Sequence, residues 1–349
     1  MRVFNYRELK DKKWDNEIIG YVAQIHEHKA KQEMFLKQKP EELEKLVEIA
    51  KVQSTEASNE IEGIRTTSTR LKQLLSEKTT PKNRDEEEIA GYSDVLNIIH
   101  ESYEYIPITS NYILQLHKTL YSHSAKVIGG NYKNVQNYIS ATDSNGNTYT
   151  LFTPLAPYET APAIENICDE FNKTMAESEV DPLILIPIFI HDFLCIHPFL
   201  DGNGRMSRLL TTLLLYRCGY LVGKYISLEA KISKNKNLYY DALEQSQQDW
   251  HNGNDNPEAF IKYLLGTIIS AYRDFEERVD IVSDNLPAIE IVKKAISTIL
   301  GKFNKTKIIE LCPSISIKSI ESALKKLADS DLIEKHGTGK STFYTRKNI

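Results

Sequence analysis

The chain has 349 residues, past the length at which one hydrophobic core usually gives way to two or three folded units. With 41% hydrophobic and 26% charged residues, its composition is that of a globular protein and excludes a chain that is disordered throughout. The net charge of −5 is unevenly distributed, because the segment from Leu286 to the C-terminus carries +6 and the residues before it carry −11.

Cysteine spacing and hydropathy predict a cytoplasmic protein without a membrane partner. The four cysteines form no C-x-x-C pair, which excludes the usual zinc motifs and disulfide frameworks. The longest apolar run, Leu183–Ile190, is far shorter than the ~20 residues of a membrane-spanning helix. The N-terminus also lacks the apolar core of a signal peptide.

The first third of the chain is predicted to be helical. Residues 1–15 have a mixed composition, and we expect them at the periphery. The segment Pro40–Ile61 has proline at a first helical position, glutamates in its first turn and a stop at Gly63, which predicts a helix. Two further helices are predicted over residues 86–100 and 110–121.

A β-hairpin is predicted over residues 129–157, inside a chain that is otherwise helical. Two runs of β-branched and aromatic residues flank Asn145-Gly146, which is the strongest short signal for a hairpin turn. Helices are predicted to resume over residues 161–175, 181–197, 205–218, 237–248 and 257–279.

The basic C-terminal segment has the layout of a winged helix-turn-helix. After a linker at residues 280–287, three helices are predicted over residues 288–300, 305–311 and 316–328, followed by two short strands about Gly337-Thr338-Gly339. The third helix and the strands carry the cations that would contact phosphates, Lys325, Lys326, Lys335, Lys340, Arg346 and Lys347. We expect this segment to contact DNA or a protein, and support of a dimer is the alternative.

The stretch His197–Arg208, with the sequence HPFLDGNGRMSR, predicts an anion site. Pro198 ends one helix, and the turn that follows contains Gly202 and Gly204, where backbone N–H groups can approach a ligand closely. The first-turn amides of the next helix have no intrahelical acceptor, so they are available to an anion.

Charged side chains in the same stretch indicate a nucleotide site with a base. Arg205 and Arg208 lie on one side of the first helical turn, where phosphates would offset their charge. Asp201 is the kind of lone carboxylate that holds Mg²⁺ together with phosphate oxygens. His197 is the one group in the stretch that takes a proton near neutral pH.

Every specified position of this stretch matches the signature H-x-F-x-[DE]-G-N-G-R-x-x-R, so the chain resembles the Fic family over roughly residues 45–270. The resemblance implies a mostly α fold, a Fic-type helical bundle with a hairpin flap, and transfer of AMP from ATP to a Tyr, Thr or Ser hydroxyl of a target protein. It also favours a homodimer. The implied domains are an N-terminal helical region at residues 1–110, a catalytic core at 111–280 and the winged helix at 286–349.

The resemblance also implies a role for each signature residue. His197 would deprotonate the target hydroxyl, which attacks the α-phosphorus of ATP while pyrophosphate leaves. Asp201 would hold Mg²⁺, and Phe199 would anchor the loop in the core. The phosphates would be bound by Gly202, Asn203, Gly204, Arg205 and Arg208.

An upstream motif resembles the inhibitory motif of the family, [ST]-x-x-x-E-[GN]. Here it reads Ser58-Asn59-Glu60-Ile61-Glu62-Gly63, at the end of a helix predicted over about residues 40–63. Ser58 and Glu62 share one helix face. In the family this glutamate pairs with the second signature arginine, here Arg208, and ATP then binds in a pose unfit for transfer. The alternative is an ordinary surface glutamate.

Further residues take their implied roles from their place in the family order. The target-docking flap would include Val135, Gln136, Asn137, Tyr138 and Ile139, and an exposed strand edge there would pair with an extended peptide. Lys133 stands where the family often has arginine. A hairpin that merely covers the core is the alternative.

Tyr240 would stack on adenine and Gln247 would bind its edge, unless both belong to the core. His191 and Asp192 are interpreted as structural polar residues.

Two other functions stay open. One is removal of AMP, or transfer of another phosphate-linked group, at the same site. The other is a DNA-binding regulator that senses a nucleotide.

Overall fold

The computed structural model describes residues 2–38, 40–76, 79–125, 127–142, 146–282, 287–299, 301–312, 315–339 and 342–347. The chain divides into two compact units. The first comprises Met1–Ala30 and Ala50–Ala271, and the second comprises Lys31–Ile49 and Tyr272–Ile349. Across the described ranges, no helix combines the length and apolar character that crossing a bilayer requires.

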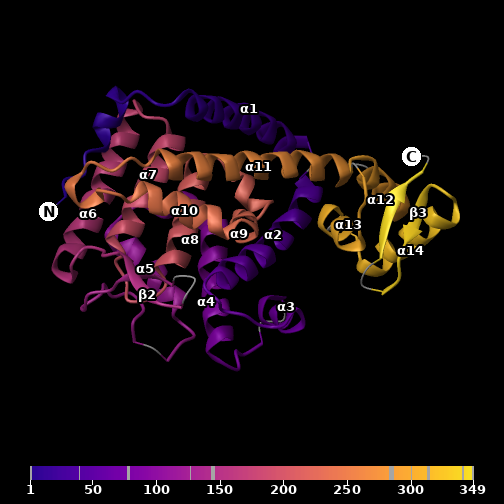
Figure 1. Ribbon diagram of the computed structural model, residues 1–349, viewed down its shortest axis with the longest axis horizontal. Coiled ribbons are helices and arrows are strands. Elements are labelled where there is room, and N and C mark those ends of the chain that lie inside the picture. The colour runs from indigo at the N-terminus through magenta and orange to yellow at the C-terminus, as the bar shows by residue number, and fades with distance from the viewer. Residues whose placement is uncertain are drawn as a thin grey trace. The chain divides into compact units, whose positions relative to one another are not determined.

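The helices of the first unit, including those that continue into the second, appear in Figure 1. In chain order they are η1 Tyr6–Asp11, α1 Asn16–Gln38, α2 Pro40–Ile61, α3 Ser68–Ser76, α4 Arg84–Ser102, η2 Tyr103–Tyr105, α5 Ser110–Leu120, α6 Pro157–Glu177, α7 Pro182–Ile196, α8 Asn203–Arg217, η3 Leu221–Lys224, α9 Leu228–Lys234, α10 Lys236–Ser246, η4 Trp250–Asn252 and α11 Glu258–Val282. The prediction of a mostly helical chain is therefore confirmed.

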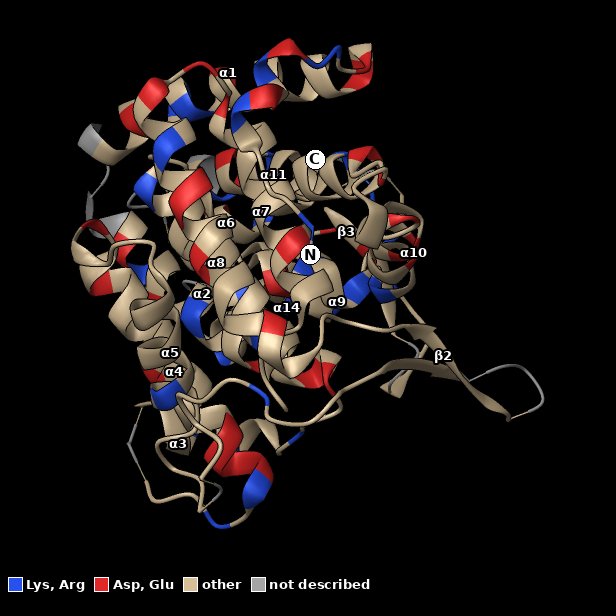
Figure 2. Ribbon diagram, turned by 90° about the vertical axis from the view of Figure 1, so that its left-hand side faces the viewer, with Lys and Arg blue, Asp and Glu red and all other residues tan. Residues whose placement is uncertain are grey.

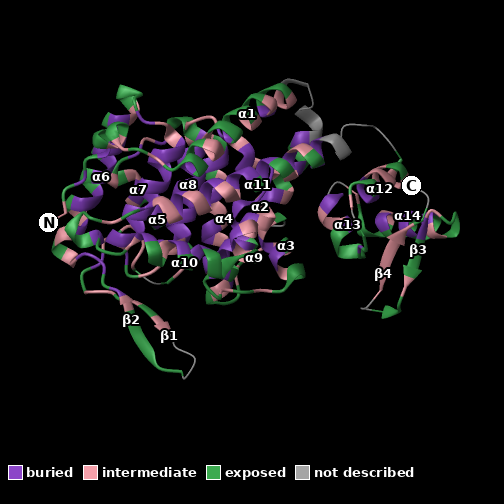
Figure 3. Ribbon diagram, turned by 45° about the horizontal axis from the view of Figure 1, so that its top comes forward, coloured by how far each residue is buried: buried purple, intermediate pink, exposed green. Residues whose placement is uncertain are grey.

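Helices α7 and α8 form the centre of the first unit. α7 is apolar on all sides, and every residue from Leu183 to Ile196 is buried, as expected for a helix surrounded by others. It packs against α6 and α8, and α8 also packs against α4 (Figure 3). The Asp181 side chain accepts from the Leu183 N–H at the start of α7, and Pro198 follows its end. The signature loop is thus held between two buried helices.

The N-terminal segment differs from the prediction that residues 1–15 are peripheral. Phe4 and Tyr6 are buried, with 5% and 3% of their surface exposed. Tyr6 donates a hydrogen bond to Asp192 in α7, and Arg2 forms ion pairs with Asp192 and Asp255. Two aromatic rings and a cation that matches buried carboxylates explain why the start of this mixed segment is anchored to the core, while its other described residues are not buried.

The predicted hairpin is present, but its strands are shorter than the predicted segment. β1 Ile139–Thr142 pairs antiparallel with β2 Thr148–Phe152, with Thr142 opposite Thr148. The two strands extend away from the helices, and neither contains a charged residue (Figure 2). Gly146 has the positive φ of 87° expected in such a turn, while Asn145 lies outside the described residues.

The C-terminal part of the second unit contains three helices and a two-stranded antiparallel sheet. These are α12 Ala288–Ser297, α13 Lys305–Leu311, α14 Ile317–Asp329, β3 Ile333–His336 and β4 Phe343–Arg346. They enclose their own apolar core, which includes Val292, Ile296, Ile308, Ile320 and Leu324. The elements follow the order predicted from the sequence, and Leu286 and Lys340 lie outside the described residues. Their interpretation as a winged helix stays a prediction.

Candidate active site

A cavity of about 330 Å³ opens over the signature loop in the first unit. Its walls come from the start of α8, the end of α2, the start of α4, α10 and both hairpin strands. Among its lining residues are His197, Asp201, Gly202, Asn203, Gly204, Arg205, Arg208, Glu62, Tyr240 and Gln247. The tertiary structure therefore gathers around one cavity the signature and two regions predicted separately from it.

His197 follows the last residue of α7 and has a left-handed backbone, with φ 52° and ψ 63°. Its Nδ1 lies 3.2 Å from the Leu194 carbonyl oxygen, which can only accept, so Nδ1 carries the proton in the neutral ring. Nε2 is then the basic atom. Burial lowers the pKa of His197 to about 4, and the nearby Lys133 charge acts in the same direction.

The backbone approaches the cavity closely around the start of α8, because Gly202 and Gly204 have no side chain. Gly202 adopts the left-handed region with φ 86° before the helix begins. A Cβ at Gly204 would collide with the Glu62 carboxylate, which lies directly over this turn. The Asn203 side chain differs from its predicted role: it accepts from the Phe199 N–H at 2.9 Å and donates to the Phe199 carbonyl at 2.7 Å. It closes the loop, so only its backbone N–H remains for phosphate.

Phe199 anchors the loop, as predicted, and a histidine that the sequence reasoning missed holds it there. Phe199 is fully buried and stacks on the His117 ring at a centroid distance of 3.6 Å. His117 accepts at Nδ1 from the Gly130 N–H, so its Nε2–H donates to the Asp201 carbonyl at 3.1 Å. Burial lowers the pKa of His117 to about 4, which keeps this tautomer neutral.

Arg205 has a buried partner that was not predicted. Its Nη2 lies 2.8 Å from a Glu88 carboxylate oxygen, and Arg205 and Glu88 are 1% and 2% exposed. The same nitrogen donates to the Tyr121 hydroxyl. Arg84, also missed, donates to Glu88 at 2.7 Å and approaches Asp201 at 3.6 Å. Glu88 therefore lies between two arginines at the edge of the cavity, and no local sequence pattern connects it to the signature.

Arg208 joins the signature to the predicted inhibitory helix. Its Nε donates to the Ser58 hydroxyl at 2.8 Å, and its Nη2 donates to the Ser58 carbonyl at 2.9 Å and to Glu62 at 2.7 Å. Burial alone would raise the pKa of Glu62, but the charge and hydrogen bond of Arg208, together with the charges of Arg205 and Lys236, outweigh it and lower the pKa. Lys236, another residue missed, donates to the Ile61 carbonyl at 2.5 Å and so caps the end of α2.

The residues predicted as a docking flap divide into two groups. Ile139 lies in β1, and Tyr138, just before it, is 60% exposed. Val135 precedes the strands and is also exposed, whereas Gln136 donates to the Pro154 carbonyl. Asn137 differs most from its predicted role, because its amide donates to carbonyls of the signature loop. It faces the body of the first unit rather than a partner.

Tyr240 and Gln247 both line the cavity, together with Leu243 and Glu244. Tyr240 is 42% exposed, which argues against the alternative that it belongs to the core. Gln247 lies just past the last residue of α10 rather than within the helix. Lys236 lies over the Tyr240 ring at 5.6 Å from its centroid, which brings a positive charge to this end of the cavity.

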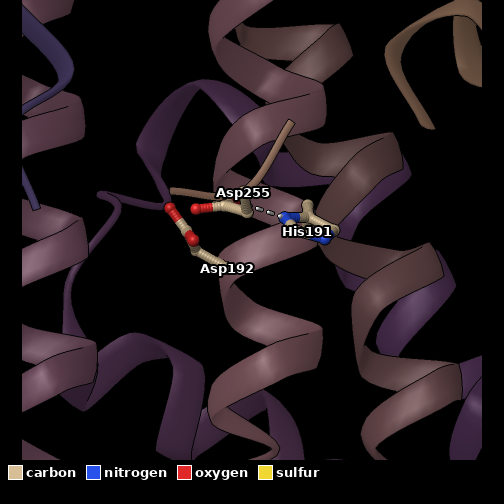
Figure 4. Close-up of side chains that lie close together, drawn as sticks. All are labelled: His191, Asp192 and Asp255. Carbon is tan, nitrogen blue, oxygen red and sulfur yellow. Dashed lines mark ion pairs between the residues drawn. The ribbon is translucent and has the colours of Figure 1, made fainter. Parts of the chain in front are cut away.

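His191, Asp192 and Asp255 place potential metal-binding atoms within 4.8 Å of one another (Figure 4). Arg2 already neutralises this cluster, since its guanidinium lies 3.4 Å from Asp192 and 2.5 Å from Asp255. The Trp250 indole also donates to Asp192 at 2.7 Å. These contacts support the structural role predicted for His191 and Asp192.

Curated relatives match the part of the chain that contains the site. The protein adenylyltransferase Fic of Drosophila willistoni is 31% identical over 134 residues, which are 38% of this chain and 25% of that protein. The protein adenylyltransferase fic-1 of Caenorhabditis briggsae is 29% identical over 142 residues, or 39% and 25% of the two chains. The match thus spans about a quarter of the length of these relatives.

Solved structures share the fold over a longer part of the chain. A Fic family protein from Desulfovibrio desulfuricans aligns with a TM-score of 0.61 at 18% identity, covering 97% of this chain and 98% of that one. A Fic domain containing signaling protein from Bacteroides thetaiotaomicron aligns with a TM-score of 0.62 at 24% identity, covering 74% and 97%. The model of the Fic/DOC family matches residues 107–215. These residues, which hold the complete signature, therefore form a domain of the Fic/DOC family.

Proposed function

We propose that the chain is an autoinhibited protein adenylyltransferase, which transfers AMP from ATP to a Tyr, Thr or Ser hydroxyl of a target protein. The curated relatives that match around the signature bear the name protein adenylyltransferase. The observation that carries the proposal is one cavity lined by His197, whose Nε2 is the basic atom, by the first turn of α8 and by Arg208. A base next to an anion site suits transfer of a phosphate-linked group.

In the proposed reaction, His197 Nε2 takes the hydroxyl proton while the hydroxyl oxygen attacks the α-phosphorus. The bond from the α-phosphorus to the bridging oxygen breaks, and pyrophosphate leaves. With a pKa of about 4, the imidazole is neutral at pH 7 and can accept a proton. The negative charge of bound ATP raises this pKa toward neutrality, which makes the base stronger when the substrate is present.

The residues around the cavity fit ATP and Mg²⁺. Among the described residues, Nε and Nη1 of the buried Arg205 have no hydrogen-bond acceptor, and phosphate oxygens would supply them. Asp201 is 38% exposed, which suits the usual Mg²⁺ arrangement of one carboxylate with phosphate oxygens and waters. The ion would neutralise phosphate charge there. Tyr240 and Gln247 line the same cavity, and we assign them to the adenine.

Autoinhibition is proposed from the position of the Glu62 carboxylate. It lies over Gly204 at the positive end of α8 and binds Arg208, so an anion of the protein takes a place that suits a phosphate. ATP bound beside Glu62 would have to shift its terminal phosphates. Its α-phosphate would then not be oriented for attack by the hydroxyl that His197 deprotonates.

The reaction is tested with ATP labelled at the α or the γ position and incubated with the purified chain and a cell lysate. We expect protein-bound label from the α position only, and His197→Ala should lower it by about 100- to 10,000-fold with ATP affinity retained. Label from γ only would indicate a kinase. ATP binding without transfer, together with tight duplex binding, would favour the nucleotide-sensing regulator.

Replacement of Glu62 tests the inhibitory role. Glu62→Gly should raise self-modification with α-labelled ATP on the order of tenfold or more, because Arg208 becomes available to the nucleotide. Glu60→Gly, which removes an exposed glutamate of the same helix, is the matched control. Equal activity of Glu62→Gly and the parent would remove the autoinhibition proposal. If a modified target loses its AMP only when Glu62 is present, that result would favour removal of AMP as the reaction of this site.

The remaining partner assignments are proposals of the same kind. β1 and β2 form a two-stranded sheet, so each strand keeps one edge to which a target peptide can add. Tyr138 and Ile139 are the flap residues that we retain for this docking. A homodimer, and contact of the C-terminal segment with DNA or protein, are retained as predictions from the sequence.

A further inference from the structure

The segment from Lys133 to Asn137 contacts every carbonyl of the turn that contains the base. Lys133 Nζ donates to the Ile196 carbonyl at 3.0 Å, and the Lys133 backbone N–H donates to the Pro198 carbonyl at 2.8 Å. The Asn137 amide donates to the His197 carbonyl at 3.2 Å and to the Phe199 carbonyl at 3.0 Å. Four consecutive carbonyls, from residue 196 to residue 199, are therefore bound by two residues.

These contacts form a single network rather than separate bonds. Lys133 Nζ also donates to the Asn137 side-chain oxygen at 2.9 Å, which fixes the orientation of the amide so that its nitrogen faces the loop. Lys133 is 3% exposed, and within this arrangement its ammonium group has two acceptors, the Asn137 oxygen and the Ile196 carbonyl. A lysine this deeply buried is stable only when its donors are satisfied.

The network surrounds a strained residue. His197 has φ 52°, in the left-handed region that a residue with a Cβ rarely adopts. Such a backbone persists only when its surroundings determine it. The turn is held from inside by Asn203, which binds Phe199, and from outside by Lys133 and Asn137. Without the outer contacts, the carbonyls that flank His197 would be free to rotate, and the imidazole would rotate with them.

We propose that Lys133 and Asn137 are positioning residues, which hold the strained turn so that His197 Nε2 faces the reacting hydroxyl. The inference rests on the proposed function. β1 begins at Ile139, two residues after Asn137, so the segment that orients the base continues directly into the proposed docking strand. Docking of a target and orientation of the base thus depend on one stretch of backbone.

The test compares variants in the Glu62→Gly background by kcat, by KM for ATP and by direct ATP binding. Asn137→Asp is isosteric and keeps an acceptor for Lys133, but it has no N–H for the two carbonyls. We expect Asn137→Asp and Asn137→Ala to lower kcat by about 10- to 100-fold, with ATP affinity within about threefold of the parent. Asn134→Ala, an exposed residue of the same segment, is the matched control and should match the parent.

Lys133 provides a second readout through the charge that it places near His197. Glu62 from α2 and Lys133 are the ionisable groups that act on the His197 ring, and in the Glu62→Gly background Lys133 remains. Lys133→Met should raise the pKa of His197, so the acid limb of kcat against pH moves to higher pH. Lys133→Arg keeps the charge and N–H donors and should recover most of the activity lost in Lys133→Met.

Titration of the His197 ring by NMR separates this inference from the proposed function. If the Glu62→Gly parent transfers no AMP, the function proposal fails, and the His197 resonances still report whether Lys133→Met and Asn137→Asp change the ring environment. Unchanged kcat together with unchanged His197 resonances would overturn the positioning role. So would a lower melting temperature with unchanged kcat, because that result shows a structural contribution alone.

Discussion

Arg208 is held by three hydrogen bonds to the end of α2, two to Ser58 and one to Glu62. The two bonds to Ser58 orient the guanidinium, and the bond to Glu62 neutralises it. Glu62 is the more exposed partner, with 33% of its side chain accessible against 4% for Arg208. A phosphate of the proposed nucleotide would therefore reach this pair by displacing the carboxylate, while the arginine would stay in place.

The pH dependence of the proposed inhibitory contact follows from the pKa of Glu62, which Arg208, Arg205 and Lys236 together lower below its ordinary value of 4.5. A lowered pKa means that the contact is complete above pH 4.5 and is lost as the pH falls through the lowered value. We expect the activity ratio of Glu62→Gly to the parent to stay constant between about pH 6 and 8. A ratio that falls steadily across that range would show that another group controls the contact. Initial rates with α-labelled ATP measure it.

At the scale of elements, α7 links the signature loop to the N-terminal segment. Its Asp192 accepts hydrogen bonds from Tyr6 and Trp250 and pairs with Arg2, three partners from outside the helix. Desolvation raises the pKa of Asp192 to about 6 despite the Arg2 charge, so ionisation of this carboxylate depends on its partners. The loop that carries His197 begins five residues later along the same helix.

Removal of that carboxylate should destabilise the first unit. We expect Asp192→Ala to lower the free energy of unfolding by about 3–5 kcal/mol, because it leaves Arg2 and two donors without this partner. Tyr6→Phe removes one hydrogen bond and should cost about 1 kcal/mol. Lys10→Ala breaks an exposed pair with Glu179 and should leave the free energy of unfolding nearly unchanged. Urea unfolding monitored by tryptophan fluorescence measures all three, and equal midpoints for Asp192→Ala and Lys10→Ala would contradict the prediction.

At the scale of the whole molecule, the chain combines an acidic part that contains the site with a basic C-terminal segment. Several cations of that segment are paired within it: Lys305 binds Glu321, and Lys347 lies near Asp331 and Glu334. Lys325 and Lys335 line a groove between α14 and the sheet. These pairs are already cancelled in the net charge of +6, so Lys325 and Lys335 are better candidates for contact with phosphates than the paired lysines.

If the segment contacts DNA, the groove lysines should carry the binding. We expect Lys325→Glu with Lys335→Glu to weaken duplex binding of the full chain by at least about tenfold, and the parent's affinity to fall steeply with salt. Lys347→Glu, at a lysine already paired with Asp331, should have a smaller effect. Fluorescence anisotropy with labelled duplex measures these affinities. Salt-independent binding, or none, would favour a protein partner.

The sequence by itself determined most of what depends on local spacing. The helix ends follow from Pro198 and the glycines, the hairpin follows from alternation around a turn, and the signature places a base, an anion site and a carboxylate within twelve residues. The inhibitory motif could also be read locally, because Ser58 and Glu62 are one turn apart. Its partner Arg208 came from the family resemblance.

The tertiary structure decided how these local features meet. The contacts of Glu88 with Arg205, His117 with Asp201, Lys236 with Ile61 and Asn137 with His197 span 60 or more residues, so no periodicity connects them. Asn203 and Asn137 show the limit most clearly. An asparagine side chain both donates and accepts, and only packing determines whether it binds a ligand or the protein's own backbone. In this chain both bind the turn that orients His197.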